Sequence, residues 1–305
     1  MYSPDICSNI ATNDKMMVGL HLNEYSFLDW FKRNINGSVW NYTKKVVSEK
    51  IPIPLSLSIL LHPLGVDAIQ YGWNDYTSSL SLWMLKRLQG KFSVSIHGPY
   101  ESPEYSLSSS NEKIRCSSVK KLERIARIAE KMGSFVVIHP GGQHYNDYNR
   151  TRESFYKSLE ELCSKGLGKI ISVETKPNIR DYVLTTTPEG LDEIEVMLEL
   201  YPVNITYDVR GFVYGHKNEK EANEYAREGI RRFDQKINCV HLSDFQPGNN
   251  NHLGIDEGII EWESFAKELN SIGYNRDLII EVMETPHIIS SILKLRSLLK
   301  NNGYS

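Results

Sequence analysis

Residues 135–142 read FVVIHPGG: four apolar residues, then a histidine, a proline and two glycines. A short apolar run bounded by turn residues is typical of a buried β-strand. Seven further runs of this kind occur in the chain: MVGLHLNE (17–24), VDAIQYGW (66–73), FSVSIHGPY (92–100), IISVETKP (170–177), ITYDVRG (205–211), NCVHLSD (238–244) and LIIEV (278–282). The sequence therefore predicts eight strands.

The spacing of these runs indicates how the strands are connected. From the third run onward, successive runs begin 43, 35, 35, 33 and 40 residues apart. Each interval leaves room for one strand, one helix and two loops, which is the βα repeat of a parallel barrel. The sequence therefore predicts an α/β fold, a single (β/α)8 TIM barrel over residues 16–305. Residues 1–15 are interpreted as an N-terminal arm.

Helical periodicity supports the repeat. Between residues 119 and 132, apolar side chains recur every three or four positions, which predicts an amphipathic helix that ends near Gly133. Pro188 is placed as the first-turn proline of another helix. Residues 151–163, 264–269 and 288–299 supply further helical segments.

The composition is that of a folded protein. The 305 residues are 40% hydrophobic, and 35 basic against 38 acidic residues give a net charge of −3. These values exclude a disordered or fibrous chain. No run of ~18 apolar residues and no secretory signal pattern is present, so no membrane partner is expected. Four widely spaced cysteines form no C-x-x-C pair, which favours a cytoplasmic location. The slight negative charge makes a nucleic acid partner unlikely.

The ends of the third to eighth runs carry similar side chains. In a TIM barrel the C-terminal ends of the strands form the functional face. A single histidine or acid there is more often structural, but several at one register favour a metal centre, because unpaired buried charge is costly. Imidazole and carboxylate are common ligands of divalent ions. The six residues are His97, His139, Glu174, Asp208, His241 and Glu281.

In these residues and in several short runs, the chain resembles the xylose-isomerase-like barrel superfamily. The runs are SIHGPY, VVIHPGG, SVETKP, YDVRG, VHLSD and HLGIDEG. The resemblance extends from about Met16 to the C-terminal helix. That superfamily includes sugar and sugar phosphate isomerases and epimerases, inosose dehydratases and endonuclease IV. No single run is specific, but their order and spacing together are.

The resemblance implies particular ligand sets. Epimerase-like members hold one divalent ion, and the matching residues here are Glu174, Asp208, His241 and Glu281. Endonuclease IV keeps this set for one zinc and adds a second ion, for which His97 and His139 match the extra ligands. A third ion in endonuclease IV needs a further group. Of its positions, Gly211 and Asn250 do not match and only His252 does, although His216 lies nearby in the sequence.

The leading hypothesis is a metal-dependent isomerase or epimerase of a sugar, sugar phosphate or related polyol, with Mn²⁺, Zn²⁺, Co²⁺ or Mg²⁺ as cofactor. By resemblance, Glu174 and Glu281 act as an acid/base pair across an enediolate. One alternative is an endonuclease IV-like phosphodiesterase acting at abasic DNA. Another is a barrel that binds metal without turnover. The sequence leaves open the sugar, the number of ions and whether the chain forms a homo-oligomer.

Some residues permit two interpretations. Trp73 either stacks on a sugar face or is an aromatic residue of the core or the rim. Arg210 either binds an anionic group of the substrate or pairs with a neighbouring acid, and His252 is a further candidate for substrate binding. Glu284 competes with Glu281 as the ligand after the eighth strand, and Glu281 is favoured because it directly follows the β-branched run. The glycine pair 141–142 is interpreted as a tight turn rather than a phosphate-binding loop.

Overall fold

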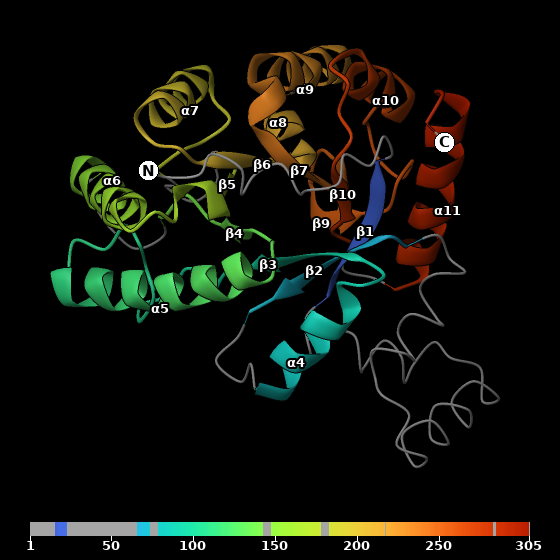
Figure 1. Ribbon diagram of the computed structural model, residues 1–305. Helices are drawn as coiled ribbons and strands as arrows, with labels where there is room; N and C mark the ends of the chain where they lie inside the picture. Colours follow the sequence, from blue (N-terminus) through green and yellow to red (C-terminus); the bar gives the residue numbers. More distant parts are fainter. Residues whose placement is uncertain are drawn as a thin grey trace.

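The computed structural model of the chain describes residues 16–22, 66–73, 79–142, 148–177, 183–216, 218–282 and 285–304. Within these ranges, eight parallel strands close into a barrel in the order β1-β10-β7-β6-β5-β4-β3-β2 (Figure 1). The strands are β1 Met17–Leu22, β2 Ala68–Gly72, β3 Ser93–His97, β4 Val136–Ile138, β5 Ile171–Glu174, β6 Asn204–Asp208, β7 Ile237–Leu242 and β10 Asp277–Ile280. The predicted (β/α)8 architecture is confirmed, while the predicted arm, 1–15, lies outside the described residues.

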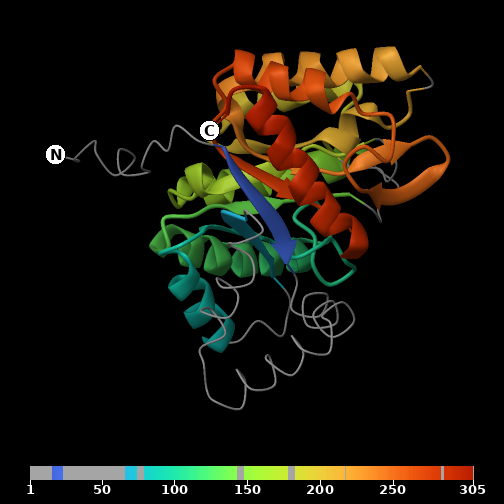
Figure 2. The ribbon, with the colours of Figure 1, turned by 90° about the vertical axis from the view of Figure 1, so that its right-hand side faces the viewer.

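Helices lie around the outside of the barrel, and Figure 2 shows the C-terminal helix running beside β1. None of the helices in the described ranges is long and apolar enough to cross a bilayer. They are α4 Ser79–Leu88, α5 Glu112–Lys131, α6 Tyr148–Ser164, α7 Pro188–Leu200, α8 Val209–Val213, α9 Glu219–Phe233, α10 Trp262–Ser271 and α11 Thr285–Asn301, with 3-10 turns η2 Gly168–Ile170 and η3 Asp234–Lys236.

The helix ends follow the local signals in the sequence. After α5, Gly133 has φ +59°, a left-handed conformation that closes the helix at the predicted place. Pro188 opens α7, and the Thr187 side chain accepts a hydrogen bond from the backbone N–H of Gly190. Apolar periodicity in the sequence does not single out α4 or α9, although the βα repeat requires a helix in both places.

A small hairpin follows β7 and is absent from the sequence prediction. Strand β8 (Asp244–Gln246) pairs antiparallel with β9 (Asn249–Leu253). The buried Asp244 carboxylate accepts hydrogen bonds from Trp262 Nε1 at 2.9 Å and from the Ile260 N–H at 3.1 Å. These bonds fix the hairpin, which carries His252, against the start of α10.

The loops after β3 and β4 are tied to each other and to the outer helices. The buried Arg115 of α5 donates to Ser158 Oγ, and this hydroxyl donates to the Leu107 carbonyl at 2.6 Å. Ser108 Oγ accepts from the Gly142 N–H at 2.9 Å. At Gly141, φ is +74° and a Cβ would lie 2.5 Å from Ser108 Cβ, so only glycine fits. The glycine pair therefore packs as a tight turn.

Candidate metal centre

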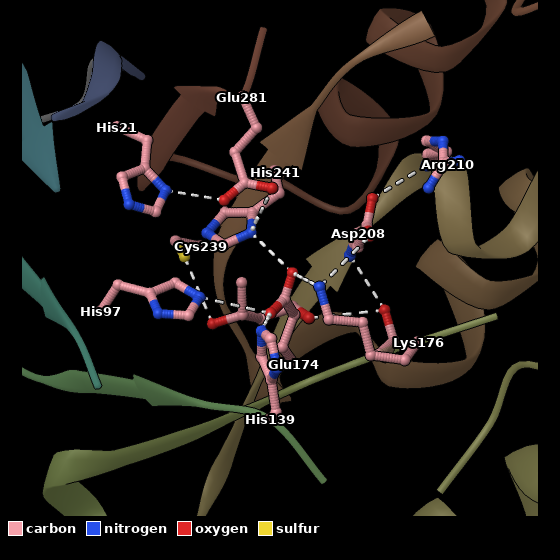
Figure 3. Close-up of polar contacts among 12 residues, drawn as sticks. His21, His97, His139, Glu174, Lys176, Asp208, Arg210, Cys239, His241 and Glu281 are labelled. Atoms are coloured by element: carbon pink, nitrogen blue, oxygen red, sulfur yellow. Dashed lines mark hydrogen bonds and ion pairs between the residues drawn. The ribbon is translucent and has the colours of Figure 1, made fainter. Parts of the chain in front are cut away.

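The C-terminal ends of the barrel strands, here called the mouth, bring histidines and carboxylates together around Glu174 (Figure 3). Glu174 ends β5 and is 1% exposed. Its Oε1 lies 3.0 Å from His241 Nδ1, at the end of β7. Its Oε2 lies 3.1 Å from His139 Nε2 and 3.5 Å from His97 Nε2. One carboxylate thus contacts side chains from three other strand ends.

Glu281 follows β10 and approaches the same histidine from another side. Its Oε2 lies 3.4 Å from His241 Nδ1. Its Oε1 accepts a hydrogen bond of 2.8 Å from His21 Nδ1, which comes from β1. The His21 ring also stacks on the His97 ring, with centroids 5.1 Å apart. The two glutamates therefore share one imidazole nitrogen.

These contacts define two overlapping groups of possible metal ligands. In each, one nitrogen or oxygen from every residue lies within 4.8 Å of the others. The histidine-rich group consists of His97, His139 and Glu174, and the carboxylate-rich group consists of Glu174, His241 and Glu281. Glu174 belongs to both, so it could bridge two ions.

The chemistry of the donor atoms fits a divalent cation. Glu174 Oε2 is buried and makes no well-formed hydrogen bond to any described residue, although two imidazole nitrogens lie nearby. Burial, with Lys176 close by, lowers the pKa of His139 to about 4, so this imidazole is neutral at physiological pH. Neutral imidazole and ionised carboxylate are the forms that bind Zn²⁺ and Mn²⁺. An unsatisfied buried oxygen between such donors is what a cation would stabilise.

The charges in the mouth depend on one another. Burial opposes ionisation of Glu174, yet Lys176 and His241 hold the pKa of its carboxyl well below the usual range. Burial likewise opposes ionisation of Glu281, and His241 and His21 lower the pKa of that carboxyl. Burial alone would lower the pKa of His241, but the Glu281 and Glu174 carboxylates raise it well above the ordinary value. Both glutamates are therefore anionic at neutral pH.

Asp208, the fourth proposed ligand, is adjacent to this cluster but has other partners. It ends β6, and its Oδ1 accepts from the Arg210 N–H at 3.1 Å, which caps the short helix α8. Its Oδ2 lies 3.9 Å from Lys176 Nζ, and that ammonium is 2.5 Å from Glu174 Oε1. Lys176 thus stands between Asp208 and Glu174. The structure brings Glu174, His241 and Glu281 together, and Asp208 joins them through this lysine.

The remaining candidate residues are more dispersed. Trp73 is 9% exposed and packs in the hydrophobic core, which favours the core interpretation. The buried Arg210 guanidinium lies over the ring of Tyr214, 5.6 Å from its centroid. His252 donates from Nδ1 to the Glu281 carbonyl at 2.9 Å, so it borders the mouth. The His216 ring packs on Tyr225.

Glu284 and the Asn250 side chain lie outside the described part of the structure. The choice between Glu281 and Glu284 therefore rests on the contacts of Glu281 alone.

Two mouth residues, His21 and Lys176, are absent from the sequence prediction. His21 lies two residues after Gly19 on β1, so strand alternation points it into the barrel. Lys176 follows Glu174 by two residues in the same loop. The alternation of side chains along the first strand could have identified His21. The position of a cation two residues after a proposed ligand could have identified Lys176.

The fold agrees with comparisons to known proteins. The family described as the xylose isomerase-like TIM barrel matches residues 60–298, and the chain belongs to that family. Uncharacterized protein MJ1311 of Methanocaldococcus jannaschii is 28% identical over 248 residues, covering 77% of this chain and 82% of that protein.

Two solved structures have the same fold. A D-tagatose 3-epimerase-like protein aligns with TM-score 0.66 and 24% identity, covering 78% of this chain and 90% of that one. Endonuclease IV from Thermus thermophilus aligns with TM-score 0.62 and 18% identity, covering 93% and 99%. At these identities the likeness is one of fold.

Proposed function

We propose that this protein is a divalent-metal-dependent isomerase or epimerase of a small polyhydroxylated molecule: a sugar, a sugar phosphate or a related polyol. The observation that carries the proposal is the convergence of Glu174 and Glu281 on His241, whose Nδ1 lies 3.0 and 3.4 Å from their oxygens. Their strands, β5 and β10, are three steps apart in the barrel, so the carboxylates reach one point from different sides. Such a pair suits removal of a proton by one carboxylate and its return by the other.

The proposed ion is Mn²⁺, Zn²⁺, Co²⁺ or Mg²⁺, and the carboxylate-rich group with Asp208 would hold it. When bound, a divalent ion polarises a substrate carbonyl and lowers the cost of the negative charge that remains after the neighbouring proton leaves. The protein supplies the rest. His21 orients Glu281 through the 2.8 Å hydrogen bond, and Lys176 and His241 orient Glu174. Both carboxylates are ionised at neutral pH and able to accept a proton.

Lys176 adds a second source of positive charge. Its side chain is 14% exposed, so the ammonium reaches the mouth while it contacts Glu174. A fixed ammonium beside the reacting carbons stabilises the oxyanion of an enediolate, because its charge is already in place when the oxyanion forms. The order in which the two glutamates act depends on the substrate face that carries the proton.

The test is isotope exchange. Protein loaded with Mn²⁺ is incubated in D₂O with a panel of aldoses and ketoses, free and phosphorylated, and the products are analysed by NMR; chelator-treated protein is the control. We expect one substrate to acquire deuterium at the carbon next to its carbonyl, because the abstracted proton exchanges with solvent. An unlabelled product would indicate a hydride shift and contradict the two-carboxylate mechanism.

A second candidate is phosphodiester hydrolysis at abasic DNA, and the histidine-rich group favours it. His97 and His139 would hold a second ion together with Glu174, and two neighbouring ions would suit phosphodiester cleavage. Against it, Gly211 stands where a third ion would need a ligand, and a Cβ there would lie 3.2 Å from the Thr175 carbonyl. The candidate therefore ranks second.

The two candidates differ in a simple assay. We expect little or no incision of an abasic duplex by metal-loaded protein. Efficient, metal-dependent incision would make the nuclease the leading function. Stoichiometric metal together with inactivity in both assays would instead favour a barrel that binds metal without turnover.

A further inference from the structure

The layer of side chains directly below the mouth is polar, although the interior of such barrels is usually filled with branched apolar residues. Along a strand, residues two positions apart face the same side, so this layer lies under the ligands. Each of its members below is fully buried. Ser95 lies below His97, Ser172 below Glu174, Thr206 below Asp208 and Cys239 below His241, with Gln70 of β2 beside them.

Hydrogen bonds connect this polar layer. Ser172 Oγ and Thr206 Oγ1 are 2.7 Å apart, and the Cys239 thiol donates to Thr206 Oγ1 at 3.4 Å. Gln70 Nε2 lies 3.9 Å from Cys239 Sγ and 3.4 Å from Ser95 Oγ. Cys239 is therefore the point at which contacts from β2 and β6 meet.

The thiol also meets a metal-binding candidate. His241 directs Nδ1 toward the two glutamates, and Figure 3 shows the Cys239 sulfur beside the other side of the imidazole. Burial raises the pKa of the Cys239 thiol, and the neighbouring His241 side chain acts in the opposite direction, as expected for two groups that lie close together. Nε2 of His241 is buried and has no hydrogen-bond partner among the described residues. The thiol is thus the polar group nearest to Nε2 in Figure 3 that could act as its partner.

This arrangement matters because the two nitrogens of a ligating imidazole have different tasks. One holds the metal, and the other donates its proton to a neighbouring acceptor, which fixes the orientation of the ring. Carboxylates and backbone carbonyls usually act as that acceptor. Here the corresponding place belongs to a sulfur atom, itself held by Gln70 and Thr206.

We propose that Cys239, held by Gln70, is a positioning residue that keeps the His241 ring turned so that Nδ1 faces the metal site. This inference rests on the metal-dependent function proposed above. It assigns the buried thiol a task in metal binding rather than in redox chemistry or general packing.

The test compares Co²⁺ affinity, measured by calorimetric titration, with the visible spectrum of bound Co²⁺, which reports ligand geometry. For Cys239→Ala we expect affinity to fall ~10- to 100-fold with an altered spectrum, because an outer partner of a ligating histidine is lost. Cys239→Ser, whose hydroxyl still donates and accepts, should recover affinity to within ~3-fold of the native protein. Gln70→Leu should fall between them.

Ile279→Val is the matched packing control, since Ile279 lies in the same interior layer, against Gly19, and carries no polar group. It should leave Co²⁺ affinity and spectrum unchanged. Native affinity in Cys239→Ala, or an equal loss in Ile279→Val, would overturn the proposal.

The outcome is separable from that of the proposed function. If the native protein binds no ion, the proposed function is wrong. The role of Cys239 is then tested by the orientation of the His241 ring in crystals of metal-free Cys239→Ala. A rotated His241 ring in that variant, with the native orientation in Ile279→Val, supports it. A native ring orientation in both refutes it.

Discussion

Two buried carboxyl groups at opposite ends of the barrel behave in opposite ways. Asp277, at the start of β10, is 3% exposed and accepts one hydrogen bond of 2.8 Å from Ser93 Oγ. Burial raises the pKa of Asp277 to about 6. Glu174, at the end of β5, is buried more completely, yet the pKa of its carboxyl lies well below the usual range. The same sheet therefore holds one carboxyl group that resists ionisation and one that favours it.

The difference comes from the neighbours and not from burial. Burial disfavours the charged form at both sites. Glu174 has Lys176 and His241 beside it, whereas among the described residues the group that lowers the pKa of Asp277 is the Ser93 hydroxyl. The mouth thus keeps a buried carboxyl group ionised, which is a property of metal and catalytic sites. No cation is among the causes of the pKa shift of Asp277 in the part of the chain that the structure describes.

The largest effect is expected from Glu174→Gln, because Glu174 belongs to both ligand groups. Loss of its charge should reduce turnover of the identified substrate about 10³-fold and lower metal content in both groups. Activity and metal stoichiometry are measured together. Glu153→Gln, an exposed carboxyl on α6, is the control and should behave as the native protein. Full metal with near-normal turnover in the Glu174 variant would remove Glu174 from the mechanism.

Glu281→Gln affects only the carboxylate-rich group and should cost about 10²-fold in turnover. The amide keeps an oxygen ligand but cannot carry the proton, so exchange of substrate deuterium should fall in parallel. Metal in the histidine-rich group should persist. A variant that retains metal and exchanges deuterium at the native rate would show that Glu281 is not one of the proton-transfer pair.

Lys176→Met removes the cation that lowers the pKa of Glu174 and that has no counterpart among the causes of the pKa shift of Asp277. Because Lys176 lowers the pKa of Glu174, its removal should raise that pKa. The acid limb of kcat/KM, which requires the ionised carboxylate, should then move to higher pH, and kcat should fall about tenfold through loss of the ammonium. Lys176→Arg keeps the charge and should leave the acid limb near its native place. An unmoved limb in the Met variant would contradict the electrostatic role.

Asp277→Asn should change stability and leave activity intact. The pKa of Asp277 is raised from 3.8 to about 6, so its contribution to folding is fully present below pH 3.8 and is lost as pH rises through about 6. Since Asn remains neutral, the variant should be more stable than the native protein by about 1–2 kcal/mol at pH 8. Denaturation of metal-free protein at pH 4 and pH 8 measures the difference. A variant that is less stable at pH 8 would mean that the ionised Asp277 is stabilising.

Most of the barrel could be predicted from the sequence because its signals are local. Runs such as FVVIHPGG (135–142) predict a buried strand from eight residues alone. Pro188 and Gly133 predict helix ends from their backbone preferences. The hairpin of β8 and β9 was not predictable in this way. Its strands are short, and it is held by Asp244 bonding to the start of α10, a contact between distant residues.

The candidate site could be predicted only in part, for a related reason. The register of strand ends places His97, His139, Glu174, His241 and Glu281 at one end of the barrel, and the structure brings these five together. Neither the sharing of Glu174 between two groups nor the position of Lys176 between Glu174 and Asp208 follows from register. Both depend on side-chain rotamers and mutual charge, which one sequence does not encode locally.

Closure of the barrel has a consequence for synthesis of the protein. The hydrogen bond between His21 and Glu281 joins residues 260 positions apart, because β1 and β10 are neighbours in the sheet. During synthesis β1 leaves the ribosome before β10, so the His21–Glu281 hydrogen bond cannot form until residue 281 has emerged. His97 and His139 can meet Glu174 before that point, whereas His241 meets both glutamates only after β10 has emerged. A proteolytic cut that removes either β1 or β10 should therefore break this contact and open the barrel, whichever of the two strands is lost.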